Sequence, residues 1–165
     1  MAAISADALR DSRNRNSVKQ ETFPIKTSVT LYIGEAVAFS TLNRLTTGAA
    51  AASLRPAGVV TAFVNESGLP ITAGTGNAGG TVKATIEWGC EFLFTILTAA
   101  ATYVNVGKNV FLANNNEMTD TTAAGTAAVR VKFGSIAGFA LTAAGAPTKT
   151  SAWVAVRVYG DADAT

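Results

Sequence analysis

The chain has 165 residues, with 13 Lys and Arg, 11 Asp and Glu and no histidine, so its formal net charge is +2. This length suits a single domain with a sizeable core. Charged residues make up only 15% of the chain, against roughly 25% in ordinary soluble domains. The absence of histidine removes the commonest general base and metal ligand. So little charge is typical either of a plain small-residue surface or of a surface that is largely covered by a partner.

The first 26 residues contain five Lys and Arg against three Asp and Glu, which accounts for the whole net charge. We interpret this segment as an extended N-terminal arm, because it has too few large apolar residues to offset its own ordering entropy. It is either a disordered tail or a segment that orders on a partner. Its mixed charges suit a protein surface better than a phosphate backbone, so no nucleic-acid partner is expected. A single β domain is expected at 27–160, followed by a free C-terminal tail at 161–165.

After Pro24 the sequence changes to apolar and polar residues in alternation, the pattern of half-buried strands. Gly48 and Pro56 bound a segment, 42–56, that is either one loose helix or a loop. The pattern predicts an all-β fold, a small jelly-roll-like sandwich or barrel of about nine or ten short strands. Strands are expected at 28–34 with 35–40 as its continuation, and at 58–64, 69–72, 81–89, 91–97, 108–113, 117–121, 128–134, 135–142 and 151–160.

The stretch VGKNVFLANNNEMTD, residues 106–120, places two apolar runs on either side of three consecutive asparagines. Asparagine tolerates the left-handed backbone conformation that tight hairpin turns require. This stretch therefore predicts a β-hairpin.

The only cysteine, Cys90, follows an apolar run, which is typical of a small buried hydrophobic residue. No apolar stretch reaches the roughly 20 residues of a membrane-spanning helix. The N-terminus also lacks the charged-then-apolar pattern of a signal peptide. We expect no membrane partner and synthesis without secretion.

Four glycines at 73–80 invite comparison with a phosphate-binding loop, but they lead into a strand and not into a helix N-terminus. A flexible surface loop is the expectation. Glu35, Glu87 and Glu91 are the only plausible carboxylate set, and nothing in their spacing indicates a hydrolase; Glu87 and Glu91 are expected to face solvent or to pair with Arg and Lys. We expect no catalytic residue, metal site or cofactor, and the chain is not expected to be an enzyme.

At VGKNVFLANNNEMTD (106–120), VRVKFGSIAGFALTAA (129–144) and AWVAVRV (152–158), the chain resembles the small capsid decoration, or cement, proteins of tailed bacteriophages. The shared features are a Gly-led strand, a short polar hairpin, a strand entering Ile-Ala-Gly-Phe-Ala and a final V-x-V-x-V strand. GEAVAF (34–39) and RPAGVV (55–60) fit the same style, so the resemblance covers most of residues 28–160. The arm and the loop at 73–80 lie outside it.

The resemblance implies a protein made in the host cytoplasm that binds the outer surface of an icosahedral head. Its partners would be the major capsid protein and further copies of itself, as a homo-dimer or homo-trimer on the shell. Position and charge, and no family motif, suggest the residues of the contact. Capsid carboxylates would pair with the arm's basic residues, and two further residues would anchor the base of the arm: Arg10, Arg13, Arg15 and Lys19, then Phe23 and Pro24.

Two other classes remain open. A receptor-binding or carbohydrate-binding β-module of a phage fibre or spike would carry exposed aromatic residues in loops, whereas the Trp and Tyr residues here lie in or beside expected strands. A major subunit of a filament or tail tube would carry a longer ordered helix, which the sequence does not predict.

Overall fold

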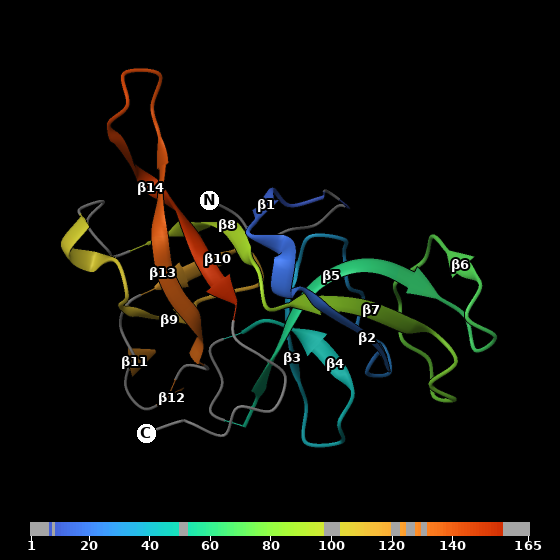
Figure 1. Ribbon diagram of the computed structural model, residues 1–165. Coiled ribbons are helices and arrows are strands. Elements are labelled where there is room, and N and C mark those ends of the chain that lie inside the picture. Colours follow the sequence, from blue (N-terminus) through green and yellow to red (C-terminus); the bar gives the residue numbers. More distant parts are fainter. Residues whose placement is uncertain are drawn as a thin grey trace.

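The computed structural model describes residues 7, 9–49, 53–97, 103–119, 123–124, 128–129 and 132–156. Within these residues all regular structure is β, apart from two single 3-10 turns, η1 (Arg15–Ser17) and η2 (Tyr103–Asn105). The strands form two main sheets (Figure 1), so the expectation of an all-β barrel or sandwich is confirmed. Fourteen strands replace the expected nine or ten, because several have only two or three residues.

The first sheet is a closed five-stranded barrel, because β14 pairs with β8 as well as with β13. All its strand pairs are antiparallel except the parallel pair of β8 and β10. A short strand, β1 (Ser12–Arg13), lies beside the first residues of β8. The barrel strands are, in spatial order, β8 (Glu91–Ile96), β10 (Glu117–Thr119), β9 (Asn109–Leu112), β13 (Lys132–Leu141) and β14 (Pro147–Val156).

The second sheet is antiparallel and curls so that its edges approach at one end, where Ile25 bridges Leu45. A separate two-stranded pair consists of β11 (Ala123–Ala124) and β12 (Ala128–Val129). The strands of the second sheet are, in spatial order, β2 (Lys19–Pro24), β7 (Lys83–Trp88), β5 (Arg55–Val64), β3 (Ala36–Phe39) and β4 (Leu45–Thr47), with β6 (Pro70–Ile71) beside β5.

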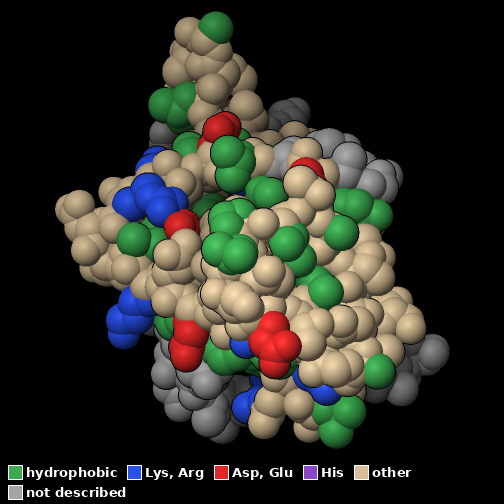
Figure 2. All heavy atoms as spheres, turned by 90° about the vertical axis from the view of Figure 1, so that its right-hand side faces the viewer, with side chains coloured by type: hydrophobic (Ala, Val, Ile, Leu, Met, Phe, Trp, Pro, Cys, Tyr) green, Lys and Arg blue, Asp and Glu red, His purple; other side chains and the backbone are tan. Residues whose placement is uncertain are grey.

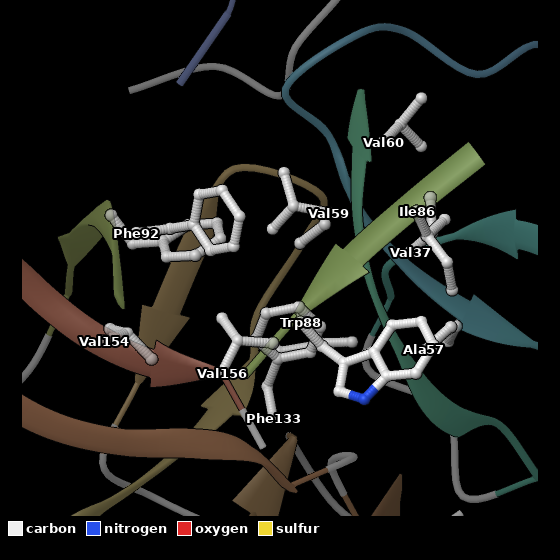
Figure 3. Close-up of a cluster of buried hydrophobic side chains, with 14 of the residues drawn as sticks. Val37, Ala57, Val59, Val60, Ile86, Trp88, Phe92, Phe133, Val154 and Val156 are labelled. Atoms are coloured by element: carbon white, nitrogen blue, oxygen red, sulfur yellow. The ribbon is translucent and has the colours of Figure 1, made fainter. Parts of the chain in front are cut away.

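One hydrophobic core joins the two sheets. Figure 3 shows Val59 of the second sheet extending toward Phe92 of the barrel, while the indole of Trp88 lies beside Ala57. Burying side chains of this size stabilises the fold by about 1.5–3 kcal/mol each. Because the side chains interleave across the boundary, the sheets fold as one unit.

The chain passes from the second sheet to the barrel at a sharp corner between β7 and β8, formed by Gly89 and Cys90. Gly89 has a φ of +78°, and a Cβ on it would lie 2.4 Å from the carbonyl oxygen of Ser17. The Gly89 amide donates to the carbonyl of Val156 over 3.0 Å. Cys90 is buried, as expected, and burial raises the pKa of its thiol.

Two local expectations need correction. The strand expected at 28–34 is an irregular segment with one isolated bridge between Thr30 and Thr75, because Ser28 has a positive φ that breaks an extended run. The segment 42–56, expected as a loose helix or a loop, is not helical in its described residues and contains a turn, then β4, whose residues pair with β3, and the start of β5. The strand expected at 128–134 has β12 and the first residues of β13 at its two ends, and residues 130–131 lie outside the described residues.

The hairpin expected within 106–120 is confirmed by the antiparallel pair of β9 and β10, with Met118 opposite Leu112. The expected edge piece at 69–72 is confirmed by β6. In the described part of the chain, no helix has the length and apolar character needed to cross a membrane.

We predict that Gly89→Ala lowers the free energy of unfolding by roughly 2–4 kcal/mol, because it combines a left-handed backbone with a backbone clash. The matched control is Gly68→Ala, since Gly68 has a similar φ of +80° but no atom within 4 Å of a built Cβ. That control is expected to cost only about 1 kcal/mol. Urea unfolding measures both, and equal losses would contradict the role assigned to the corner.

Candidate functional site

The N-terminal segment lies across both sheets of its own chain. β1 pairs with β8 of the barrel, and β2 pairs along its full length with β7 of the second sheet. The segment is extended, as expected. Its order comes from these pairings, so neither a disordered tail nor an arm waiting for a partner describes residues 9–24. The expected C-terminal tail, 161–165, lies outside the described residues.

The side chain of Arg10 links three separate parts of the fold. Its Nε donates to the Gly34 carbonyl over 2.9 Å, in the loop that precedes β3. Its Nη1 donates to the Leu93 carbonyl of β8 over 2.7 Å, and its Nη2 to Asn116 Oδ1 over 2.8 Å. The guanidinium also lies 4.0 Å from the ring centroid of Phe94. Burial lowers the pKa of Arg10 to about 10, so the group keeps its charge at neutral pH.

Arg13 and Arg15 bracket the corner between the sheets. Arg13 Nε lies 2.6 Å from Glu91 Oε2, just after the corner, and Arg15 Nη2 lies 2.8 Å from Glu87 Oε2, just before it. Arg13 also lies 4.5 Å from the ring centroid of Trp153 on β14. The expected pairing of Glu87 and Glu91 with basic residues is therefore confirmed, and the partners come from the N-terminal segment.

The other three residues expected at a capsid contact lie on β2. Lys19 is exposed and stands opposite Trp88 in the strand register. Phe23 packs edge-on against Phe39, with ring centroids 4.8 Å apart. Pro24 ends the strand and is half-buried. The structure thus places the six residues along one segment and turns most of them toward their own chain.

A cleft of about 290 Å³ lies beneath this segment. Val59 and Phe92 in its lining are almost fully buried, and Arg15 and Glu87 close one side of it as an ion pair. The lining of this cleft is therefore partly apolar, and the charges of Arg15 and Glu87 in it neutralise each other. The titratable residues in its described lining are Arg10, Arg15 and Glu87, and each of them is bonded to another part of the chain.

Glu35 occupies a buried position at the junction of the sheets. Its Oε2 accepts from the Tyr32 amide over 2.9 Å, and within the described residues its Oε1 has no hydrogen-bond partner. Burial raises the pKa of Glu35 to about 7, against the opposing effect of hydrogen bonds from Tyr32 and Asn115. The adjacent Ala36 amide donates to the Asn115 carbonyl over 2.9 Å. This bond holds the asparagine turn, residues 114–116 between β9 and β10, against the second sheet.

The sequence indicated that Glu87 and Glu91 pair with basic residues, but it did not indicate the contacts of Arg10 and Glu35 at the junction of the sheets. Arg10 and Asn116 are separated by 106 positions, and no local pattern predicts such a contact. The three carboxylates considered as a catalytic set have different partners in the structure. Within the described residues, no group of three or more Cys, Asp or Glu is placed to hold a metal ion.

No protein-family model matches the chain, and no curated protein matches it significantly.

We predict that Arg10→Met lowers the free energy of unfolding by roughly 2–4 kcal/mol, because it removes three charge-assisted hydrogen bonds from a partly buried site. Lys19→Met is the control, since it removes an equal charge from an exposed position and is expected to cost less than about 0.5 kcal/mol. Chemical denaturation followed by tryptophan fluorescence compares the two. An Arg10→Met protein as stable as the control would show that the three bonds contribute nothing.

Glu35 makes stability depend on pH. Its folded-state pKa of about 7 lies above the ordinary value of 4.5, so the folded state binds the proton more tightly. The stabilisation is complete below pH 4.5 and is lost as the pH rises through 7. We predict that Glu35→Gln removes this pH dependence and that, at pH 8, its free energy of unfolding exceeds that of wild type by up to roughly 3 kcal/mol. Unfolding in urea between about pH 4 and 8 measures this, and the exposed control Glu21→Gln is expected to follow wild type. The assignment is refuted if the free energy of unfolding of Glu35→Gln changes with pH in the same way as that of wild type.

Proposed function

We propose that the chain is a capsid decoration protein that binds the outer surface of an icosahedral phage head and stabilises contacts between capsomers. The observation that carries the proposal is a charge-poor surface with large apolar side chains at many exposed positions. Scattered apolar residues are ordinary on any surface, but here few charges separate them. They are Leu9, Leu42, Leu69, Leu97, Val104, Val106 and Leu141, each 43–84% exposed.

Internal ion pairing makes this surface poorer in charge than the composition indicates. Arg13 and Arg15 are paired with Glu91 and Glu87, and Arg10 is bonded to its own chain. A capsid carboxylate would have to compete with these partners. In the proposed contact Lys19 therefore supplies the accessible charge, and the three arginines hold the segment in place.

The second sheet also offers an edge to a partner. Within the described residues, β2 pairs on one side only, with β7, and four of its six residues are exposed. An unpaired edge can accept a strand from another protein through main-chain hydrogen bonds, with little demand on sequence. A modest contact of this kind, repeated over a lattice, gives a large total stabilisation when neighbouring copies are linked.

The proposed partners are the major capsid protein and further copies of the chain, as a homo-dimer or homo-trimer on the virion exterior. A receptor-binding or carbohydrate-binding module is supported less well, because stacking on a sugar ring requires an accessible aromatic face. Trp88 is only 5% exposed, and the guanidinium of Arg13 lies over the ring of Trp153.

The experiment is co-sedimentation of the purified chain with expanded phage heads stripped of their outer proteins. Deleting residues 1–22 would remove β1 and most of β2, so point variants are the sharper probe. Wild type is expected to saturate at a fixed ratio to the major capsid protein. Lys19→Glu is expected to weaken binding about tenfold, equivalent to roughly 1.4 kcal/mol. The matched charge reversal Lys108→Glu, at an exposed position before β9, is expected to bind as wild type does.

One outcome would contradict the proposed function, and another would contradict only the proposed contact at β2. Absence of saturable binding to heads of the matching source would exclude a decoration role, and binding to glycans in its place would favour the receptor-binding module. Equal loss in Lys19→Glu and Lys108→Glu would keep the role and move the contact away from β2.

A further inference from the structure

The turn between β3 and β4, residues 40–44, lies at one end of the second sheet. Figure 1 shows it at the bottom of the view, whereas the hairpin of β13 and β14 projects at the top. The Ser40 amide and hydroxyl both donate to the Arg44 carbonyl, over 2.9 and 3.0 Å. Asn43 has a φ of +56°, a left-handed conformation that asparagine tolerates. The turn is therefore closed and formed, and it presents Leu42 with 74% of its surface exposed.

Arg44 extends from this turn to two other loops, where neutral oxygens hold its guanidinium. Its Nη1 donates to Thr27 Oγ1 over 3.2 Å and to the Asn77 carbonyl over 3.4 Å. Its Nη2 donates to the Ala78 carbonyl over 3.3 Å. These hydrogen bonds are long, so they fix the position of the guanidinium without satisfying its charge.

Arg55, the first residue of β5, reaches the same turn from the strand beside β3. Its Nη2 donates to Asn43 Oδ1, and its guanidinium lies 5.7 Å from the ring centroid of Phe39. Arg55 is exposed and Arg44 is half-buried. Together with Leu42, these two arginines form what we call the basic end of the second sheet.

Among the described residues, no acidic side chain pairs with the basic end. The ion pairs between described residues are those of Arg13 and Arg15, so Arg44 and Arg55 have no carboxylate partner there. No Asp or Glu occurs in the segments that carry or contact the two guanidinium groups, which are 25–27, 38–47, 53–57 and 73–82.

The space-filling view agrees with this distribution of charge. Figure 2 shows Lys and Arg side chains along the lower edge of the face it presents, with acidic side chains higher up. The basic end therefore carries unpaired positive charge, on a chain whose formal net charge is only +2.

We propose that the basic end binds a segment of a partner protein that carries several carboxylates. A carboxylate would displace the neutral oxygens around Arg44 and Arg55, because it accepts two parallel hydrogen bonds from one guanidinium and adds the attraction of opposite charges. Arg13 and Arg15 gain nothing from such a partner, since each already has a glutamate, at 2.6 and 2.8 Å. Charge complementarity thus selects the basic end.

The basic end fits an acidic protein segment better than a nucleic acid. Leu42 adds an apolar contact beside the charges, a combination that is common in protein interfaces. Binding of a single strand would require a longer row of phosphate contacts and an accessible aromatic face for the bases. Phe39, the ring beside Arg55, is only 3% exposed. The inference goes beyond the proposed function, because it concerns a surface other than the contact at Lys19 and needs no phage head.

Fluorescence anisotropy with a labelled oligoglutamate peptide tests the inference at about 20 mM salt, where surface charges are weakly screened. Wild type is expected to bind the peptide saturably. Leu42→Glu is expected to weaken binding about tenfold or more, because it adds a like charge to the peptide's site. The matched control is Leu69→Glu, since Leu69 is 61% exposed in the turn before β6, and it is expected to bind as wild type does. Thermal melts check that both variants fold.

A pair of double variants tests the arginines themselves. Arg44→Gln with Arg55→Gln is expected to abolish binding of the peptide. Lys108→Gln with Lys132→Gln removes the same charge from positions beside β9 and in β13, and it is expected to keep most of the binding. This comparison separates a local site from attraction to the net charge of the chain.

The inference is overturned if wild type does not bind the peptide, if Leu42→Glu binds as tightly as Leu69→Glu, or if both double variants lose binding equally. Tighter binding of single-stranded DNA with the same number of charges would also overturn it, in favour of a nucleic-acid partner. Head binding by the same proteins is a separate result. Peptide binding that depends on the basic end, without any binding to heads, would leave the inference standing and remove the decoration role.

Discussion

The burial of one guanidinium between two sheets is the constraint on which the rest of this structure depends. Arg10 reaches the second sheet through Gly34, the barrel strand β8 through Leu93 and the asparagine turn through Asn116. A charge removed from water in this way is tolerated only when its donors are matched by acceptors. Because those acceptors belong to three separate segments, the position of Arg10 specifies how the sheets meet.

The same arrangement changes what the basic N-terminal segment is available to do. Arg13 and Arg15 neutralise Glu91 and Glu87 on either side of the Gly89 corner, so the charge that distinguishes this segment in the sequence is largely used within the fold. What remains at the surface is a body with little charge, a β2 edge that pairs on one side only within the described residues, and a projecting hairpin whose residues 133–148 carry no charged side chain. Under the proposed function, a partner would recognise shape and main-chain edges more than charge.

Local sequence patterns predicted those elements whose structure is determined by residues close together in the sequence. Alternation between apolar and polar residues indicated the all-β fold, and three asparagines between apolar runs indicated the hairpin of β9 and β10. The patterns misled where the chain's path is set from a distance. Residues 28–34 alternate like a strand, yet the Leu31 amide bonds to the carbonyl of Gly74 in a loop far along the sequence. The Arg10 junction was unpredictable for the same reason, because its members are up to 106 positions apart.

The central claim is that the N-terminal segment is part of the folded body in the free chain. Amide hydrogen exchange of residues 11–24, measured at a concentration where the chain is monomeric, tests it most directly. The strand pairings of β1 and β2 predict protection comparable to that of their partners β8 and β7. Exchange of residues 11–24 at the rate of an unfolded peptide, while β7 and β8 remain protected, would contradict the claim and return the segment to the role of an arm that orders on a partner.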